Sequence, residues 1–274
     1  MISHSLMFLL DLPSGSVTAV FPPRGKGSVN VTGNFLRQQE IGYYEAELPT
    51  GTYARLQELY KRAGLDGPPE ELVVPPDTKT LSVGEVKGED EFDLRPFVLD
   101  AVPPKLEPLL DEMRKAVEHM RLGPRYALRG EGTATQPEFP LDKPVSFLVT
   151  LRNVGAEKIQ TDSPFIARGP DKVTNLRLII QREAPPNPPR EPDSLYVDLG
   201  EESVHPPEGE KAPSGGRFTL EPTKALRIVV RKKLHSTPGR YKAALSYSTT
   251  QGRHGGMESL EGVLTMDLGT FEVK

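Results

Sequence analysis

The chain has 274 residues, of which 36% are hydrophobic and 26% are charged, and its formal net charge is −4. This composition excludes a wholly disordered chain, and the length suffices for two ordinary domains. Non-specific nucleic-acid binding needs a basic face, so this acidic balance predicts no nucleic-acid partner. The absence of cysteine excludes disulfides, thiolate nucleophiles and cysteine metal sites.

The N-terminus carries one short apolar run, LMFLL at residues 6–10. The run is too short for a signal sequence and has no basic residues before it. No stretch of the chain approaches the ~20 apolar residues that a membrane span needs. We therefore predict no membrane span and a cytoplasmic location, or a periplasmic one if a leader precedes Met1.

The first half, residues 1–125, predicts an α+β domain with two helices on one side of an antiparallel sheet. The first helix should be capped by Thr50 or Thr52 and should end at Gly64. The second should begin near Leu106, because Pro108 is tolerated only in a first helical turn. The expected elements are strands over 5–12, 16–21 and 27–33, a helix over 52–63, strands over 78–86 and 92–99, and a helix over 106–122.

Residues 123–131 are expected to be a linker, and every signal after them is β. Apolar residues alternate with polar ones, as in strands that bury one face. The expected strands run over 144–153, 174–182, 217–222, 225–231, 241–247 and 263–274. A bulge at Gly269 would bring both apolar sets of the last strand to one face. Residues 131–274 therefore predict an all-β sandwich.

Tyr241 follows a Pro238-Gly239 turn, in the segment STPGRYKAALSYS. A tyrosine just after such a turn is typical of Greek-key sandwiches, where its hydroxyl bonds to upstream backbone. We interpret Tyr241 as a corner tyrosine of this kind. The alternative is an ordinary strand tyrosine.

A proline-rich insertion interrupts the alternating pattern at about residues 183–216, which contain eight prolines. One short strand, SLYVDL, is expected within it. The segment PPNPPR fits a P-x-x-P-x-R pattern, which proline holds extended and ready to bind an aromatic groove. The candidate partner-binding residues are Pro185, Pro186, Pro188, Pro189 and Arg190. The alternative is an exposed loop that binds no partner.

Three segments of the second half, FPLDKPVSFLVTLRNVG, FTLEPTKALRIVV and STPGRYKAALSYS, follow a familiar pattern. Over about residues 135–274 the chain resembles bacterial immunoglobulin-like domains of the intracellular proteinase-inhibitor type. The resemblance implies an immunoglobulin-like sandwich and an inhibitory or other protein-binding role. The proline-rich insertion departs from the compact family form, so no inhibitory loop is carried over to any residue here.

Reactive side chains form no recognisable motif in this sequence. The five histidines lie in separate segments without metal-ligand spacing. No G-x-S-x-G supports a serine nucleophile. The RGKGS of residues 24–28 lacks P-loop spacing and favours a hairpin turn. The acidic GEDEFD of residues 88–93 lacks the ligand spacing of a calcium loop. We expect no cofactor, no metal and no enzymatic activity.

The sequence therefore predicts a non-catalytic protein-binding module, of the inhibitor or immunity type in its most concrete form. A structural or assembly component of a bacterial envelope or particle is the alternative. A hydrolase with an unrecognised site is the third reading. The partner is expected to be another protein of unknown identity, and the sequence leaves the oligomeric state open.

Overall fold

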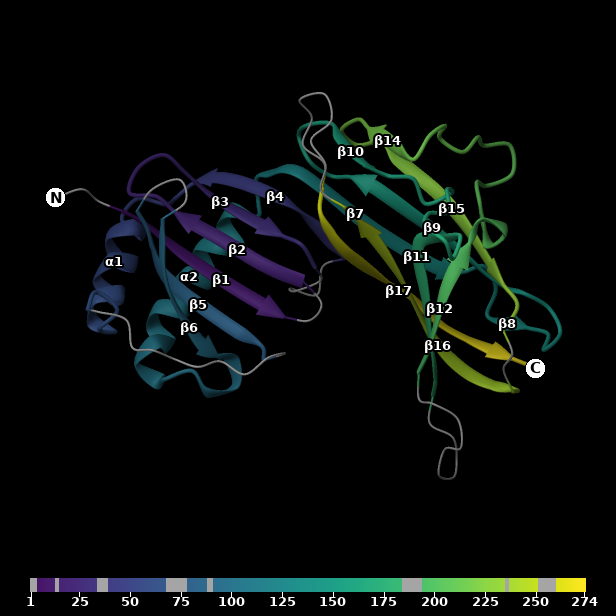
Figure 1. Cartoon of the computed structure of the whole chain (residues 1–274), viewed down its shortest axis with the longest axis horizontal. Helices are drawn as coiled ribbons and strands as arrows, with labels where there is room; N and C mark the ends of the chain where they lie inside the picture. The colour runs from purple at the N-terminus through teal and green to yellow at the C-terminus, as the bar shows by residue number, and fades with distance from the viewer. Residues whose placement is uncertain are drawn as a thin grey trace. The chain divides into compact units, whose positions relative to one another are not determined.

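The structure is a computed structural model of the whole chain (Figure 1). It describes residues 4–12, 15–33, 39–67, 78–87, 91–183, 194–234, 237–250 and 260–274. The chain is mostly β, with two α-helices and large antiparallel sheets. It forms two compact units, Met1–Phe35 with Gly42–Tyr126 and Leu36–Ile41 with Ala127–Lys274.

The first unit contains six antiparallel strands in the order β6-β5-β1-β2-β3-β4, which are part of a ten-stranded sheet. Its strands are β1 (Ser5–Leu12), β2 (Gly15–Phe21), β3 (Lys26–Val31), β4 (Glu40–Glu47), β5 (Thr80–Val86) and β6 (Phe92–Val98). One face of this sheet is apolar and buried, since Leu6, Phe21 and Val29 are fully or almost fully inaccessible to solvent. The strand β4 is absent from the sequence prediction.

Two α-helices, α1 (Thr52–Arg62) and α2 (Glu107–Met120), contact each other, and α2 also contacts β3. Short 3-10 turns η1 (Leu99–Ala101) and η2 (Pro104–Leu106) precede α2. A Cβ atom at Gly27 would meet the sulfur of Met120, which shows how closely α2 lies over β3 at this glycine. The helices thus cover the apolar face of the sheet.

The ends of these helices test three local predictions. Gly64 adopts φ 72° and the Leu65 amide donates to the Tyr60 carbonyl, which confirms the predicted glycine stop of α1. Pro108 lies in the first turn of α2, as predicted. The predicted threonine cap is wrong: the N-cap of α1 is Gly51, at φ 85°, without a side-chain cap. A left-handed backbone at this position favours glycine over threonine.

Strands of two larger sheets and one small sheet lie in the second unit. Four strands of the ten-stranded sheet come first, in the order β7-β9-β15-β13; the second sheet has the order β12-β11-β16-β17-β8, and the third pairs β10 with β14. Its elements are β7 (Pro124–Ala134, which begins in the first unit), β8 (Glu138–Phe139), β9 (Val145–Asn153), β10 (Ile159–Asp162), β11 (Val173–Arg182), β12 (Ser194–Gly200), η3 (Glu201–Ser203), β13 (Val204–His205), β14 (Arg217–Leu220), β15 (Ala225–Lys232), β16 (Gly239–Thr249) and β17 (Gly262–Val273).

The two larger sheets of this unit pack against each other through their apolar faces. The rings of Phe147 on β9 and Phe271 on β17 lie 5.6 Å apart, edge to face. Gly130 on β7 has no room for a side chain, because a Cβ there would meet the side chain of Met266 on β17. The immunoglobulin-like form of this packing stays a prediction.

The predicted linker over residues 123–131 is wrong, because β7 runs through it from Pro124 to Ala134. Its apolar alternation is hidden in the sequence, since glycines stand at the inward positions where β17 approaches closely. Glu40 begins β4 and forms an ion pair with Arg129 of β7, with Oε2 2.8 Å from Nη2. Contacts with residues distant in sequence therefore hold residues 124–134 in a strand, although the local sequence pattern predicts a linker.

Two local features of the C-terminal strands are confirmed. Tyr241 is buried and its hydroxyl donates to the Thr237 carbonyl oxygen at 2.7 Å, the upstream bond of a corner tyrosine. Gly269 adopts φ 81° where the pairing of β16 with β17 shifts register. The bulge places Leu268 and Phe271 on the same buried side.

Replacing Tyr241 by phenylalanine removes one hydrogen bond and keeps the ring in place. We expect Tyr241→Phe to lower the free energy of unfolding by about 0.5–1.5 kcal/mol, the net value of one such bond. Urea denaturation followed by circular dichroism measures the change. Tyr196→Phe is the matched control, because Tyr196 is 62% exposed and should leave the midpoint in place. Equal midpoints for Tyr241→Phe and the unsubstituted chain would contradict a corner role.

Candidate functional site

The sequence-predicted binding residues Pro185, Pro186, Pro188, Pro189 and Arg190 lie outside the described residues. So do residues 88–90 of the acidic segment, and two of the five histidines, at 235 and 254. Three places in the described part of the chain gather polar or exposed side chains: a pocket in the first unit, a buried carboxylate and a strand edge in the second.

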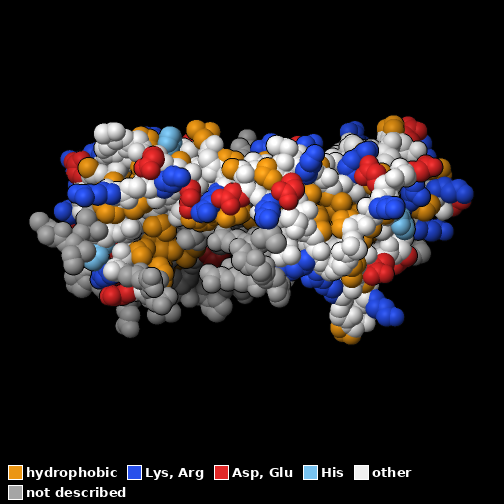
Figure 2. Space-filling model, turned by 90° about the horizontal axis from the view of Figure 1, so that it is seen from above, with side chains coloured by type: hydrophobic (Ala, Val, Ile, Leu, Met, Phe, Trp, Pro, Cys, Tyr) orange, Lys and Arg blue, Asp and Glu red, His pale blue; other side chains and the backbone are white. Residues whose placement is uncertain are grey.

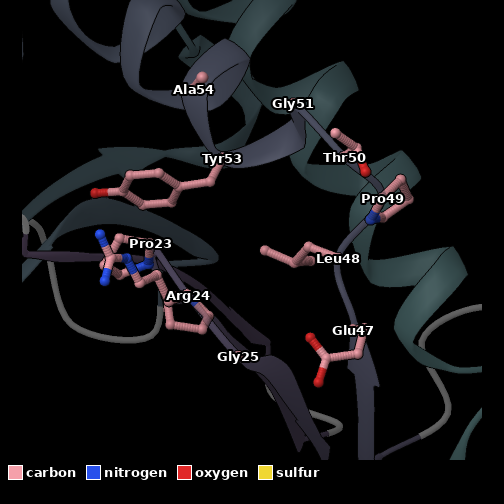
Figure 3. Close-up of a pocket in the computed structure, with 11 residues that line it drawn as sticks. Pro23, Arg24, Gly25, Glu47, Leu48, Pro49, Thr50, Gly51, Tyr53 and Ala54 are labelled. Atoms are coloured by element: carbon pink, nitrogen blue, oxygen red, sulfur yellow. The ribbon is translucent and has the colours of Figure 1, made fainter.

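The pocket lies between the β2–β3 turn and the start of α1, and its volume is about 300 Å³ (Figure 3). Its lining residues come from two short segments and are Pro22, Pro23, Arg24, Gly25, Glu47, Leu48, Pro49, Thr50, Gly51, Tyr53 and Ala54. Figure 3 shows the Tyr53 ring beside Pro23 and Arg24 on one side, with Glu47 and Leu48 on the other. Left-handed Gly25 and Gly51 turn the two segments around it.

The chemistry of this lining is that of a binding hollow. Its charged groups are one guanidinium, of Arg24, and one carboxylate, of Glu47. The Tyr53 hydroxyl is engaged, since it donates to the His4 carbonyl oxygen at 2.5 Å. The lining holds neither histidine nor serine, and its side-chain hydroxyl groups are those of Thr50 and Tyr53. The RGKGS segment at this turn enters strand β3, and a phosphate loop would instead enter a helix.

Asp162, at the end of β10, is the most enclosed carboxylate of the second unit, with 1% exposure. Its Oδ1 accepts from Arg168 Nη2 at 2.9 Å and from Arg217 Nε at 3.2 Å. Its Oδ2 accepts from the amide of Thr250 at 2.8 Å and from its hydroxyl at 3.0 Å. Both oxygens are therefore satisfied, and the carboxylate links the end of β10 to the segment after it, to the start of β14 and to the residue after β16.

The pKa of Asp162 reflects two opposing effects. Burial disfavours the charged form and by itself would raise the pKa. The amide and hydroxyl of Thr250 and the guanidinium of Arg168 outweigh burial and hold the pKa below its usual value. Behind it, the Tyr247 hydroxyl donates to the Asp162 carbonyl oxygen at 2.5 Å, and burial raises the pKa of this tyrosine strongly. Each carboxylate oxygen of Asp162 thus accepts hydrogen bonds from donors within the protein, which is typical of a buried group that stabilises the fold.

Most sheet edges in the described ranges are short or blocked. β8 and β13 have two residues each, and β10 and β14 have four. The edge strand β6 carries Pro96, which has no amide to donate, beside the charged Asp93 and Arg95. These are the ways in which proteins protect an edge from adding another strand.

In the described ranges β17 is paired by β8 only at Glu272 and Val273, whereas β12 is an edge along its whole length, with seven residues, no proline and no lysine. It pairs with β11 on one side and ends the sheet on the other. Every second residue of an antiparallel edge strand points its N–H and C=O away from its neighbour. Leu195 and Tyr196 at this edge are 42% and 62% exposed. Asp198 is neutralised by Arg177 of β11, whose Nε lies 2.6 Å from its Oδ1. The edge thus offers free backbone groups beside apolar side chains.

The sequence predicted β12 as a short strand but did not identify it as a site. The available signal was an alternating, proline-free SLYVDL placed directly after a proline-dense segment. That pattern could not reveal that β12 ends its sheet, because strand order depends on pairing between distant segments.

Neither a cluster of metal ligands nor a long apolar helix is present in the described ranges. In these ranges, no three His, Asp or Glu side chains lie close enough together to hold a metal ion. His119, on α2, places Nε2 3.1 Å from the Glu47 carbonyl oxygen. None of the helices described is both long enough and apolar enough to cross a membrane.

No protein-family model and no curated protein matches the chain. Among solved structures, the chain is similar to the Pseudomonas fluorescens alkylpurine DNA glycosylase AlkC bound to DNA containing an abasic site analog, with TM-score 0.28 and 11% identity over 62% of this chain and 36% of that chain. It is similar to a β-glucosidase from Erythrobacter marinus, with TM-score 0.26 and 12% identity over 52% of this chain and 15% of that chain. It is also similar to AvmM, which catalyzes macrocyclization in alchivemycin A biosynthesis, with TM-score 0.24 and 9% identity over 52% of this chain and 88% of that chain. The chain spans about a third of the glycosylase, and likenesses this low carry no argument about function.

Asp162→Asn tests the structural role of the buried carboxylate. An amide supplies one acceptor where the network uses two, so we expect a loss of roughly 2–3 kcal/mol at pH 7, typical of hydrogen bonds to a charged group. Because the folded pKa of Asp162 is lowered, its stabilisation is present at neutral pH and is lost as pH falls below the usual value of 3.8. The difference between the two proteins should therefore shrink below that pH.

Urea denaturation at pH 7 and at acidic pH measures both effects. Asp198→Asn is the matched control, since its ion pair with Arg177 is about half exposed and is worth at most about 1 kcal/mol. A stability difference for Asp162→Asn no larger than that of the control would contradict the assigned role.

Proposed function

We propose that this chain is a non-catalytic protein-binding module, of the inhibitor or immunity type, whose contact site is the outer edge of β12. The observation that carries the proposal is the exposure of Leu195 and Tyr196 on a strand that ends its sheet along its whole length in the described part of the chain. β8 and β13 have two residues each and β6 carries a proline, whereas β12 has seven residues and no proline. A partner segment in extended conformation adds to such an edge as a further strand.

Strand addition uses both the backbone and the side chains of β12. Each backbone hydrogen bond gained contributes a net ~1 kcal/mol, because it replaces bonds to water. Leu195 and Tyr196 add apolar contact on opposite faces of the strand, since successive side chains alternate. The proline-rich residues Pro185 to Arg190 precede this strand closely in the sequence. In this proposal they contribute to the choice of partner.

Other function classes fit the described residues less well. The pocket beside Arg24 and Glu47 has no histidine, serine or lysine in its lining, and Asp162 is engaged in a closed network. Figure 2 shows blue and red side chains interspersed over the face drawn. A mixed surface of this kind provides less attraction for nucleic-acid phosphates than a basic face does. These observations support a binding role over a hydrolase or a nucleic-acid protein.

A photo-crosslinking amino acid at position 196 tests the proposal in cells that make the chain. We expect a discrete adduct with another protein at position 196, because a partner strand would lie against this side chain. Position 263 is the matched control, since Val263 is 37% exposed and lies on β17, which β11 and β16 separate from β12 in the sheet. The same adduct at both positions, or none at 196, would overturn the assignment of the β12 edge.

A second variant separates the edge from the proline-rich segment. Replacing residues 185–193 with a Gly-Ser linker of equal length keeps β12 intact. If the prolines contribute to recognition, the yield of the position-196 adduct should fall while the thermal midpoint stays within a few degrees. An unchanged adduct would assign recognition to β12 alone.

A further inference from the structure

The pocket beside the start of α1 carries charged groups of opposite sign on opposite sides. Arg24, in the β2–β3 turn, lies beside the Tyr53 ring (Figure 3). Glu47, the last residue of β4, lies on the other side with Leu48. Both charged side chains are exposed, and neither forms a hydrogen bond or an ion pair with another residue of the described ranges. The pocket therefore offers a guanidinium and a carboxylate that the described fold does not use.

The register of β3 with β4 accounts for the position of Glu47. Lys26 is its partner across the two strands, yet no ion pair joins these two side chains. The Glu47 carbonyl oxygen lies 3.1 Å from Nε2 of His119 on α2. The backbone of Glu47 is thus fixed by its strand and by α2, while its carboxylate stays available to a ligand.

The rest of the lining is largely apolar and rigid. Pro22, Pro23 and Pro49 each have a fixed φ. The Tyr53 ring is held in place because its hydroxyl donates to the His4 carbonyl oxygen at 2.5 Å. Such groups lose little conformational freedom when a ligand binds, so the apolar contacts are already formed.

We propose that this pocket binds a small zwitterion of about dipeptide size, with an apolar body between an ammonium group and a carboxylate. Arg24 binds the carboxylate and Glu47 the ammonium group, while the Tyr53 ring contacts the apolar body. The volume of about 300 Å³ lies at the lower end of the range for small-molecule pockets. Because Arg24 and Glu47 stand on opposite sides, the charges of the ligand must be separated, as they are in a dipeptide but not in a single α-amino acid.

Other small ligands fit this lining less well. An anion such as phosphate would meet Arg24 but would also face the like charge of Glu47, and a simple amine would meet Glu47 but face Arg24. Like charges brought together in one site reduce affinity. A neutral ligand would remove water from both groups without replacing it by an opposite charge. A zwitterion places an opposite charge at each side.

Titration of the ¹⁵N-labelled full chain with the dipeptide alanyl-phenylalanine tests the proposal by NMR. At pH 7 both termini of the dipeptide are charged. We expect saturable shifts at the amides of Arg24, Gly25, Gly51 and Tyr53, and no saturable shift at the amide of Tyr196 in the second unit. The ion pairs are exposed, so the dissociation constant should be on the order of 1 mM.

Variants and capped dipeptides assign the two ends of the ligand. Glu47→Gln and Arg24→Gln should each weaken binding about two- to fivefold, as expected for one exposed ion pair. Acetylation of the dipeptide amino group should abolish the effect of Glu47→Gln, and amidation of its carboxylate should abolish that of Arg24→Gln. Glu107→Gln and Lys61→Gln are the matched controls, because both residues are exposed and lie outside the lining.

Three results would overturn this proposal: no saturable shift at any of the four pocket amides, equal affinity for the free and the doubly capped dipeptide, or equal affinity for the unsubstituted chain and both pocket variants. The pocket belongs to the first unit and β12 to the second, so the proposal does not rest on the β12 contact. A negative titration would leave the result of photo-crosslinking at position 196 unchanged, and the converse also holds.

Discussion

Backbone hydrogen bonding is the constraint on which the rest of this structure depends. More than half of the described residues lie in strands, and each strand carries amides and carbonyls that need partners on both sides. A sheet that does not close must therefore end somewhere, and the chain ends its sheets in several ways. β8 and β13 are cut to two residues, and β6 carries a proline at position 96. β12 differs from these three edge strands in having seven residues and no proline.

The buried carboxylate of Asp162 shows the same constraint at a loop. Where β10 ends, the neighbouring loops can no longer pair as strands, and their polar groups need another acceptor. Asp162 accepts from the Thr250 amide and hydroxyl and from two arginines. A buried charge is tolerated here because four donors surround it, and the same donors hold its pKa low. The network thus serves folding, which leaves recognition to surfaces elsewhere.

Local chemistry made part of the fold predictable from the sequence. The Gly64 stop, the position of Pro108, the bulge at Gly269 and the corner bond of Tyr241 each depend on a few neighbouring residues. The predictions that failed depend on distant contacts. Residues 123–131 resemble a linker because Gly130 stands where a larger inward residue would meet Met266 of β17. The missed strand β4 is likewise dominated by charged and aromatic residues, and Glu40 is matched by Arg129 only in the folded chain.

The candidate site was less predictable than the fold for the same reason. Proline density is visible in a sequence, so it drew attention to Pro185 and its neighbours. Being an edge is a property of strand order, which alternation alone does not contain. SLYVDL predicts a strand in either case. Only the strand order, in which β12 comes last beside β11, shows that β12 is an edge strand in the described residues.

Folding and recognition are physically separable in this chain, and the two tyrosines of the second unit illustrate why. Tyr241 is 4% exposed, bonded to Thr237 and stacked on Phe271 at 5.7 Å, so its contacts are complete within the fold. Tyr196 is 62% exposed on β12, the outermost strand of its sheet in the described residues. Under the proposed function, a substitution at Tyr196 acts mainly on association, whereas one at Tyr241 acts on stability. An open strand with exposed apolar residues is also a liability for aggregation unless a partner covers it. The proposed binding role accounts for an edge strand that has neither proline nor lysine.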